Sequence, residues 1–249
     1  MIFSFSGNVA SYFAKASGVL SQTKCYTDKM ALDHITCSLT PGITGLLGAN
    51  GAGKSTLMRM ICGVMKPTSG SITLDQYDVT QKEYRNLVGY LPQDFGYYPE
   101  FTGREFLLYV AALKGLDKKT ATVRSAQLLE QVNLEEVAKK KIKTYSGGMK
   151  RRLGIAQTLI NSPKLIVLDE PTAGLDPKER VRFRHIFEQL GKESIVLLST
   201  HIVSDIEKCA DRILIIKDGK KVFDGTEKAG EDLETFYLEI GRASCRERV

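Results

Sequence analysis

One run of nine residues is rich in glycine and ends with a lysine and two hydroxyl side chains. Residues 48–56 read G-A-N-G-A-G-K-S-T and fit the pattern G-x-x-x-x-G-K-[ST] at every fixed position. The glycines allow a loop to wrap closely around phosphate oxygens, because no Cβ atom stands in the way. Lys54 brings a cation to the β- and γ-phosphates, and Ser55 brings a hydroxyl to Mg²⁺. The run therefore predicts a nucleoside-triphosphate site, with contacts from Gly48, Ala49, Asn50, Gly51, Ala52, Gly53, Lys54, Ser55 and Thr56.

Two acidic residues follow an apolar run farther along the chain. Residues 165–170 read L-I-V-L-D-E, and the four consecutive apolar residues favour a strand buried on both faces of a parallel sheet. Asp169 then lies at the carboxyl end of that strand, which is the edge where open α/β sheets bind ligands. We expect Asp169 to hold Mg²⁺ through water. Glu170 is expected to act as general base for an attacking water, a role typically worth about 10²–10⁴-fold in rate.

Further polar positions become informative because they follow the glycine-rich run in a fixed order. Gln93 follows an expected strand at residues 88–91, and the Ser-Gly-Gly of residues 146–148 precedes a helix that starts with basic residues. Asp176 ends the run P-T-A-G-L-D, and His201 follows another expected strand. Taken singly, a Ser-Gly-Gly is usually an ordinary helix N-cap and a lone histidine is usually structural. Their fixed order along one chain favours a functional role for each of them over a purely structural one.

In this order the motifs resemble the ATP-binding-cassette (ABC) family, over roughly residues 23–239. The resemblance implies ATP as the nucleotide, Mg²⁺ as the cofactor and hydrolysis as the reaction. Gln93 matches a glutamine that joins the Mg²⁺ site to a helical subdomain, and His201 matches a histidine that contacts the γ-phosphate. The predicted catalytic residues are accordingly Glu170, His201 and Gln93, and the predicted metal site comprises Ser55, Gln93 and Asp169.

Ser146, Gly147 and Gly148 match the core of the family's signature motif, which usually reads Leu-Ser-Gly-Gly-Gln. The resemblance implies that these three residues contact ATP held by a second cassette, so that two cassettes enclose two ATP molecules head to tail. Tyr145 and Met149 depart from the motif. The change at Met149 removes one polar contact that a glutamine could make.

The resemblance also assigns roles outside these motifs. Tyr26 lies where the family has an aromatic residue that stacks on adenine. Asp176 matches a loop that runs between the two cassettes and serves communication in the dimer. The aromatic stretch Phe95–Phe101 has two interpretations, either a docking site for a cytosolic helix of a membrane subunit or a part of the core.

The function implied by the resemblance is that of the ATPase subunit of a membrane transporter. The motifs look most like cassettes of bacterial export systems for drugs, antibiotics or lipids. This predicts an integral membrane subunit on a separate chain, a homodimer of cassettes, and a cytoplasmic location, peripheral on the inner face of the cell membrane. One alternative stays open, namely a soluble ABC ATPase that serves as an assembly scaffold or mechanical signalling module.

These residues require a sheet that brings several strand ends together. Strand and helix patterns alternate along the chain, which is typical of an α/β fold. We expect a P-loop NTPase fold with a mostly parallel core sheet, an antiparallel β part, and an inserted helical subdomain at about residues 94–160. The expected strands span residues 43–47, 71–74, 88–91, 165–168, 194–199 and 212–216, and the expected helices include 54–65, 148–159, 177–190 and 202–209.

Composition narrows the class of protein. The 249 residues are 43% apolar and 26% charged with a formal net charge of +6, which suits one α/β domain and an anionic ligand but predicts no nucleic-acid partner. The five cysteines form no C-x-x-C pair, so neither a zinc site nor a disulfide framework is expected and a reducing compartment fits.

We treat residues 1–239 as a single domain. Residues 240–249 can be translated from a common sequencing-adapter sequence, so we expect them not to be native.

Overall fold

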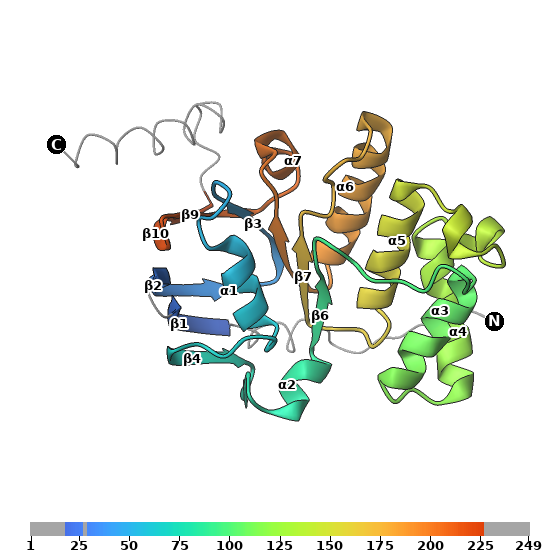
Figure 1. Ribbon diagram of the computed structural model, residues 1–249, viewed down its shortest axis with the longest axis horizontal. Helices are drawn as coiled ribbons and strands as arrows, with labels where there is room; N and C mark the ends of the chain where they lie inside the picture. Colours follow the sequence, from blue (N-terminus) through green and yellow to red (C-terminus); the bar gives the residue numbers. More distant parts are fainter. Residues whose placement is uncertain (1–17, 27–28, 227–249) are drawn as a thin grey trace.

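The computed structural model describes the backbone of residues 18–26 and 29–226, and the side chains of residues 31–226. The segment 240–249, expected to be non-native, lies outside the described residues, as does the side chain of Tyr26. Two sheets and a set of helices make up the described part (Figure 1). None of those helices combines the length and the apolar character that crossing a bilayer requires.

The larger sheet is mostly parallel, and it confirms the predicted fold class. Its strands run in the order β10-β9-β3-β8-β7-β6, in which β9–β10 is an antiparallel pair and the remaining neighbours are parallel. Adjacent parallel strands end at the same edge, so the loops that follow them lie side by side. The strands span Gly42–Leu47 (β3), Val88–Leu91 (β6), Leu165–Asp169 (β7), Ile195–Ser199 (β8), Arg212–Lys217 (β9) and Lys220–Gly225 (β10).

The central strands are apolar throughout because both faces of this sheet are covered. In β7, Leu165 and Val167 belong to one core cluster, whereas Ile166 and Leu168 belong to the other, as the alternation of side chains along a strand requires. The first cluster includes side chains of α1 (Lys54–Ile61). The second includes side chains of α5 (Gly147–Thr158) and α6 (Pro177–Gly191).

The smaller sheet is antiparallel, also as predicted, and runs in the order β2-β1-β4-β5. Buried side chains of β2 join the cluster that also holds α1, so this sheet packs over the helix rather than standing apart. In Figure 1 it lies at the lower left, next to α1. Its strands span Gly18–Tyr26 (β1), Lys29–Leu39 (β2), Ser69–Leu74 (β4) and Tyr77–Asp78 (β5).

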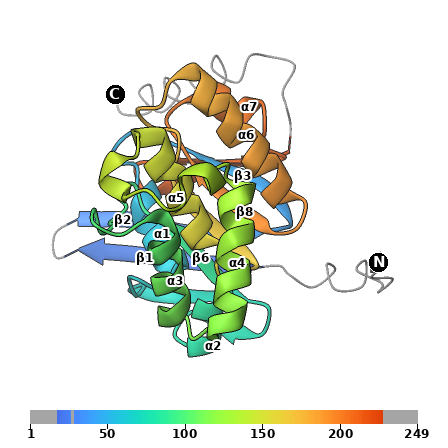
Figure 2. The same ribbon diagram turned by 90° about the vertical axis from the view of Figure 1, so that its right-hand side faces the viewer.

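The chain between β6 and β7 is helical. Its helices α3 (Gly103–Leu113) and α4 (Lys118–Gln131) run beside each other, and Figure 2 views them in front of α5. Local capping explains where they begin, because Thr102 and Glu105 form a reciprocal capping box at α3 and Asp117 accepts from two backbone N–H groups at α4. The short helices α2 (Lys82–Asn86) and α7 (Val203–Glu207) complete the α-helices.

The helix expected at residues 54–65 ends earlier, at Ile61. The reason is Gly63, which adopts a φ of 69° and so takes the left-handed conformation that terminates helices. The next residues turn instead, as the N–H groups of Val64 and Met65 both donate to the carbonyl of Arg59.

Candidate functional site

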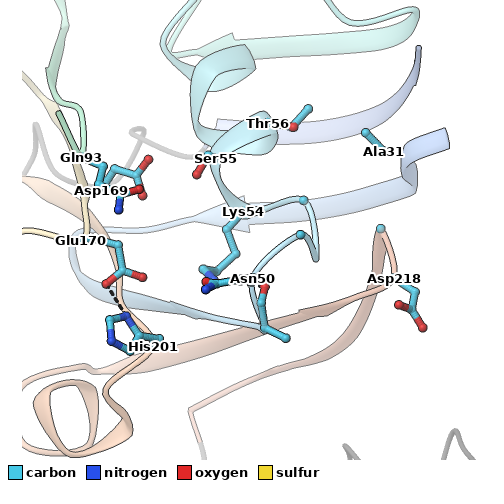
Figure 3. A pocket seen from close by; sticks show the side chains of 14 residues that line it. Ala31, Asn50, Lys54, Ser55, Thr56, Gln93, Asp169, Glu170, His201 and Asp218 are labelled. Atoms are coloured by element: carbon cyan, nitrogen blue, oxygen red, sulfur yellow. Dashed lines mark hydrogen bonds and ion pairs between the residues drawn. The ribbon is translucent and has the colours of Figure 1, made fainter. Parts of the chain in front are cut away.

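Most of the predicted site residues lie at one edge of the larger sheet, where four parallel strands end. The loop of residues 48–53 follows β3, Gln93 follows β6, Asp169 and Glu170 close β7, and His201 follows β8. Together they line a cavity of about 590 Å³, shown in Figure 3. The lining residues are Ala31, Ala49, Asn50, Gly51, Gly53, Lys54, Ser55, Thr56, Gln93, Asp169, Glu170, His201, Asp218 and Gly219.

The glycine-rich loop is packed too tightly for side chains at two of its positions. A Cβ atom at Gly48 would lie 2.4 Å from the Ile216 carbonyl oxygen, and one at Gly53 would lie 2.8 Å from the Ala31 carbonyl oxygen. Gly53 also has a φ of 109° and forms the N-cap of α1. The free N–H groups at the start of a helix, together with its dipole, attract anions. Gly48 and Ala52 shape this loop without lining the cavity.

Lys54 lies at the start of α1 with its side chain turned back into the loop. Its ammonium donates to the Gly48 carbonyl at 2.5 Å and lies 3.4 Å from the Ala49 carbonyl. Burial lowers the pKa of Lys54, and the charges of Glu170 and Asp169 oppose that shift. A buried ammonium held only by carbonyl oxygens is a ready donor to a phosphate, which would supply full negative charge instead.

Asp169 has the chemistry of a ligand for a hard cation. The residue is only 3% exposed, and burial raises the pKa of its carboxyl, while a hydrogen bond from Ser55 opposes the shift. Among the described residues no group of three or more histidine, cysteine or acidic side chains could hold a metal. The oxygen donors of Ser55, Gln93 and Asp169 all line the cavity and suit Mg²⁺, which usually takes few protein ligands and completes its shell with water and substrate phosphates.

Glu170 and His201 face each other across adjacent strands. The His201 Nδ1 atom lies 2.8 Å from Glu170 Oε2, and Figure 3 shows the two side chains pointing toward one another. Glu170 is 6% exposed and has a φ of 50°, an unfavourable left-handed conformation for a glutamate. Its backbone N–H donates to the Ser199 carbonyl at 3.0 Å, which holds the strained residue in place.

Sequence reasoning missed the β9–β10 turn, which lines the cavity through Asp218 and Gly219. Gly219 joins two parts of the fold: its N–H donates to the Ala52 carbonyl at 3.0 Å, and its carbonyl accepts from the Asp33 N–H at 2.8 Å. Figure 3 places Asp218 and Ala31 on the side of the cavity opposite to Glu170. An Asp-Gly pair between two strand-like runs is a known hairpin signal, and it could have revealed this turn.

Besides Gly48 and Ala52, four more of the predicted residues that the structure describes do not line the cavity of their own chain. Ser146, Gly147 and Gly148 lie at the start of α5, and Asp176 lies at the start of α6. Asp176 is an N-cap, because its carboxylate accepts from the Glu179 N–H at 2.9 Å. Ser146 also caps its helix. Tyr26 ends β1, where its backbone pairs with Lys29, two residues before Ala31.

The two departures around residues 146–148 have local explanations. Met149 takes part in a capping box, since its N–H donates to Ser146 Oγ at 3.2 Å and its sulfur accepts from the Ser146 N–H at 3.4 Å. The Tyr145 ring is buried, and its hydroxyl donates to the Val137 carbonyl at 2.8 Å. Both residues support the start of α5 in place of the usual side chains.

The aromatic stretch Phe95–Phe101 divides between core and surface. Phe95, Tyr97 and Phe101 pack against the second core cluster. Tyr98 is 49% exposed, and its ring lies 5.4 Å from that of Tyr109 on α3 in an edge-on contact. The core interpretation therefore holds for Phe95, Tyr97 and Phe101, whereas docking of a membrane subunit stays a prediction.

Comparisons with known proteins agree on one family. Residues 32–173 match the family model described as ABC transporter. The bacitracin transport ATP-binding protein BcrA of Bacillus licheniformis is 39% identical over 225 residues, which cover 87% of this chain and 72% of that protein. The linearmycin resistance ATP-binding protein LnrL of Bacillus subtilis (strain 168) is 39% identical over 208 residues, covering 82% and 67% of the two chains. A solved ATP-binding subunit of an ABC transporter has a TM-score of 0.81 at 29% identity, covering 91% of this chain and 99% of that one.

Proposed function

This chain belongs to the ABC transporter family, as its motifs predicted, and we propose that it is the Mg²⁺-dependent ATPase subunit of a membrane exporter. The observation that carries the proposal is the contact between Glu170 and His201 at the mouth of the phosphate-binding loop. A buried carboxylate beside an imidazole, facing the lysine of that loop, is an arrangement for activating water next to a phosphate.

The phosphates would bind over the start of α1, where the first backbone N–H groups of the helix have no intrahelical acceptor. Lys54 exchanges its carbonyl contacts for the phosphate oxygens. Ser55, Gln93 and Asp169 would hold Mg²⁺, which when bound neutralises phosphate charge. Tyr26 is proposed to stack on adenine at the end of the cavity that Ala31 lines.

Hydrolysis is assigned to Glu170 and His201. Glu170 accepts the proton of the attacking water, which then adds to the γ-phosphorus as the bond to the β-phosphate oxygen breaks. His201 orients that carboxylate through its Nδ1 atom, and the rest of its ring would contact the γ-phosphate. The strained backbone of Glu170 places the carboxylate before the substrate arrives, so little reorganisation is needed at the moment of reaction.

A second copy of the chain would complete each site. Ser146, Gly147 and Gly148 are proposed to bind the γ-phosphate held by the partner copy, because the start of a helix is an anion site and this one does not face its own cavity. Asp176 would lie between the two copies. The chain carries Gln93, Glu170 and His201 together, so a homodimer would have two competent sites.

An integral membrane subunit on a separate chain is proposed to dock beside the helical subdomain, about residues 94–160. Exposed apolar side chains lie in this region: Tyr98 contacts Tyr109 of α3, and Leu113 follows one turn later on the same helix. The exposed Val64, outside the subdomain, lines a cavity of about 290 Å³ together with Val110 and Lys114. Isolated exposed apolar residues are ordinary, but a contiguous group marks an interaction site. Such docking would place the chain peripherally on the inner face of the cell membrane.

The names of the bacitracin and linearmycin relatives support export of an antibiotic or similar amphiphile.

The test combines one variant with two measurements. Glu170→Gln should bind ATP, form a dimer in ATP and Mg²⁺, and release phosphate at least about 100-fold more slowly than the parent. Turnover at the parental rate would refute the role of Glu170. Tagged Glu170→Gln chain should also co-purify from ATP-treated membranes with one multi-spanning protein. Recovery of soluble partners alone would favour the scaffold or signalling alternative.

A further inference from the structure

Helix α5 touches the ATP site of its own chain as well as carrying the residues assigned to the partner's ATP. Ser146 to Gly148 form its first turn, and Arg151 lies on the next. The Arg151 Nη1 atom donates to the Gln93 carbonyl oxygen at 2.5 Å. At a rise of about 1.5 Å per residue, Ser146 and Arg151 are separated by only about 7.5 Å along the helix axis. One rigid element therefore joins the two sites.

The contact at Gln93 is part of a continuous stripe on α5. Three residues after Arg151, a Cβ atom at Gly154 would lie 2.8 Å from Leu91 Cδ1 and 3.2 Å from Phe95 Cδ1, so α5 packs on both sides of Gln93. Positions three residues apart lie on one face of a helix. The loop that carries Gln93 is thus held against α5 by apolar packing at its ends and by Arg151 at its centre.

The positive charge of Arg151 also lies near the carboxylates of the site. Its guanidinium is half-buried, and burial lowers the pKa of Arg151, while the charges of Asp94, Asp169 and Glu170 oppose that shift. An arginine keeps its charge in proteins, and its planar group holds a backbone carbonyl in a defined direction. Arg151 can therefore orient Gln93 while balancing part of the negative charge at the metal end of the cavity.

We propose that Arg151 is a positioning residue that couples contact of Ser146–Gly148 with the partner's ATP to the placement of Gln93 in its own site. When α5 shifts on binding the partner's γ-phosphate, the guanidinium carries the Gln93 backbone with it. Each ATP site would then sense occupancy of the other through the contact between Arg151 and Gln93. The inference rests on the proposed head-to-tail dimer and names the residue that links its two sites.

The experiment compares Arg151→Met, Arg151→Lys and the matched control Arg124→Met. Arg124 is also a partly buried arginine that donates to a backbone carbonyl, that of Leu159 at 3.2 Å, but at the far end of α5. Arg151→Met should lower kcat by about tenfold, leave KM for ATP within about twofold, and lower the Hill coefficient for ATP toward one. Arg151→Lys should restore part of kcat, whereas Arg124→Met should keep the parental kcat and Hill coefficient.

ATP binding to the monomer and the midpoint of thermal unfolding establish that each variant is folded. A parental kcat and Hill coefficient in folded Arg151→Met would overturn the inference, and so would an equal loss in Arg124→Met, which would point to general loosening of α5. The proposed function fails by a different result. In that case the parent chain itself shows no ATP-driven dimer and no phosphate release.

Discussion

Glu179 lies directly against the backbone of Gly148, although the two residues belong to different helices. A Cβ atom at Gly148 would stand 2.8 Å from Glu179 Oε2 and 3.1 Å from its Cγ and Cδ atoms. Glu179 is held there by ion pairs with Arg152 at 3.4 Å and Arg182 at 2.5 Å. Because Glu179 is in the first turn of α6, it ties the segment capped by Asp176 to the first turn of α5.

Gly148→Ala should therefore impair the dimer more than the fold. The new methyl group has to displace Glu179, which would shift the two helix ends proposed to meet the partner. We expect phosphate release to fall by about tenfold or more, with ATP binding to the monomer retained. In a helix, glycine to alanine normally stabilises by about 0.5–1 kcal/mol, so Gly147→Ala, which meets no atom within 4 Å, is the matched control for unfolding stability. Parental dimerisation by Gly148→Ala would contradict the prediction.

Lys54→Ala should weaken ATP binding while leaving the fold intact. The ammonium is buried and its pKa is lowered by that burial, so its removal relieves a desolvation cost in the free protein. Charge-assisted hydrogen bonds contribute about 1.5–3 kcal/mol each, which corresponds to a loss of roughly 10- to 150-fold in affinity. Isothermal titration with ATP in the Glu170→Gln background measures the effect. An affinity equal to that of Glu170→Gln alone would refute the assigned role of Lys54.

Asp169→Asn should stabilise the nucleotide-free chain at neutral pH and remove the stabilisation that Mg²⁺ adds in the presence of ATP. Burial raises the pKa of Asp169, so the native state favours the protonated carboxyl. Its contribution to stability is thus full below the ordinary aspartate pKa and is lost as pH rises through the raised value. Thermal unfolding of parent and variant between about pH 3.5 and pH 7 should show a difference that grows with pH. A difference that shrinks toward pH 7 would contradict this sign.

Gly219→Ala should destabilise the chain and weaken nucleotide binding. Gly219 has a φ of 77°, and a Cβ atom there would lie 2.8 Å from the Ala31 carbonyl oxygen. Strain of this kind costs of order 1–3 kcal/mol, and the hydrogen bond to the Ala52 carbonyl would be distorted with it. Gly174→Ala offers a matched control, as Gly174 has a similar φ of 71° but no atom within 4 Å of the added methyl group. Equal unfolding midpoints for the two variants would show that contact with Ala31 adds nothing.

Much of the fold was predictable because its central strands are buried on both faces. The continuous apolar runs at β7 and β8 predict buried parallel strands. Because neighbouring parallel strands end at the same edge of the sheet, Asp169 and His201 are then expected at one edge. Strand β10 was missed because its residues are partly or fully exposed and its sequence K-K-V-F-D-G lacks an apolar run. Asp218 was missed for the same reason, because its place in the cavity depends on the β9–β10 hairpin.

Other features of the site depend on contacts that no local pattern encodes. The hydrogen bond from Arg151 to Gln93 joins residues 58 positions apart and requires the packing of α5 on the loop after β6. The left-handed backbone of Glu170 is likewise invisible in the sequence, since glutamate has no preference for it. Tertiary packing imposes both arrangements on residues whose own tendencies are neutral or opposed.

The left-handed backbone at Glu170 means that the residue best suited to stability and the residue best suited to turnover differ at this position. Glycine and asparagine adopt a φ near 50° more readily than glutamate, so either replacement should make the protein harder to unfold while it removes the proposed general base. With Glu170 as the proposed general base, this position exchanges stability of the fold for turnover.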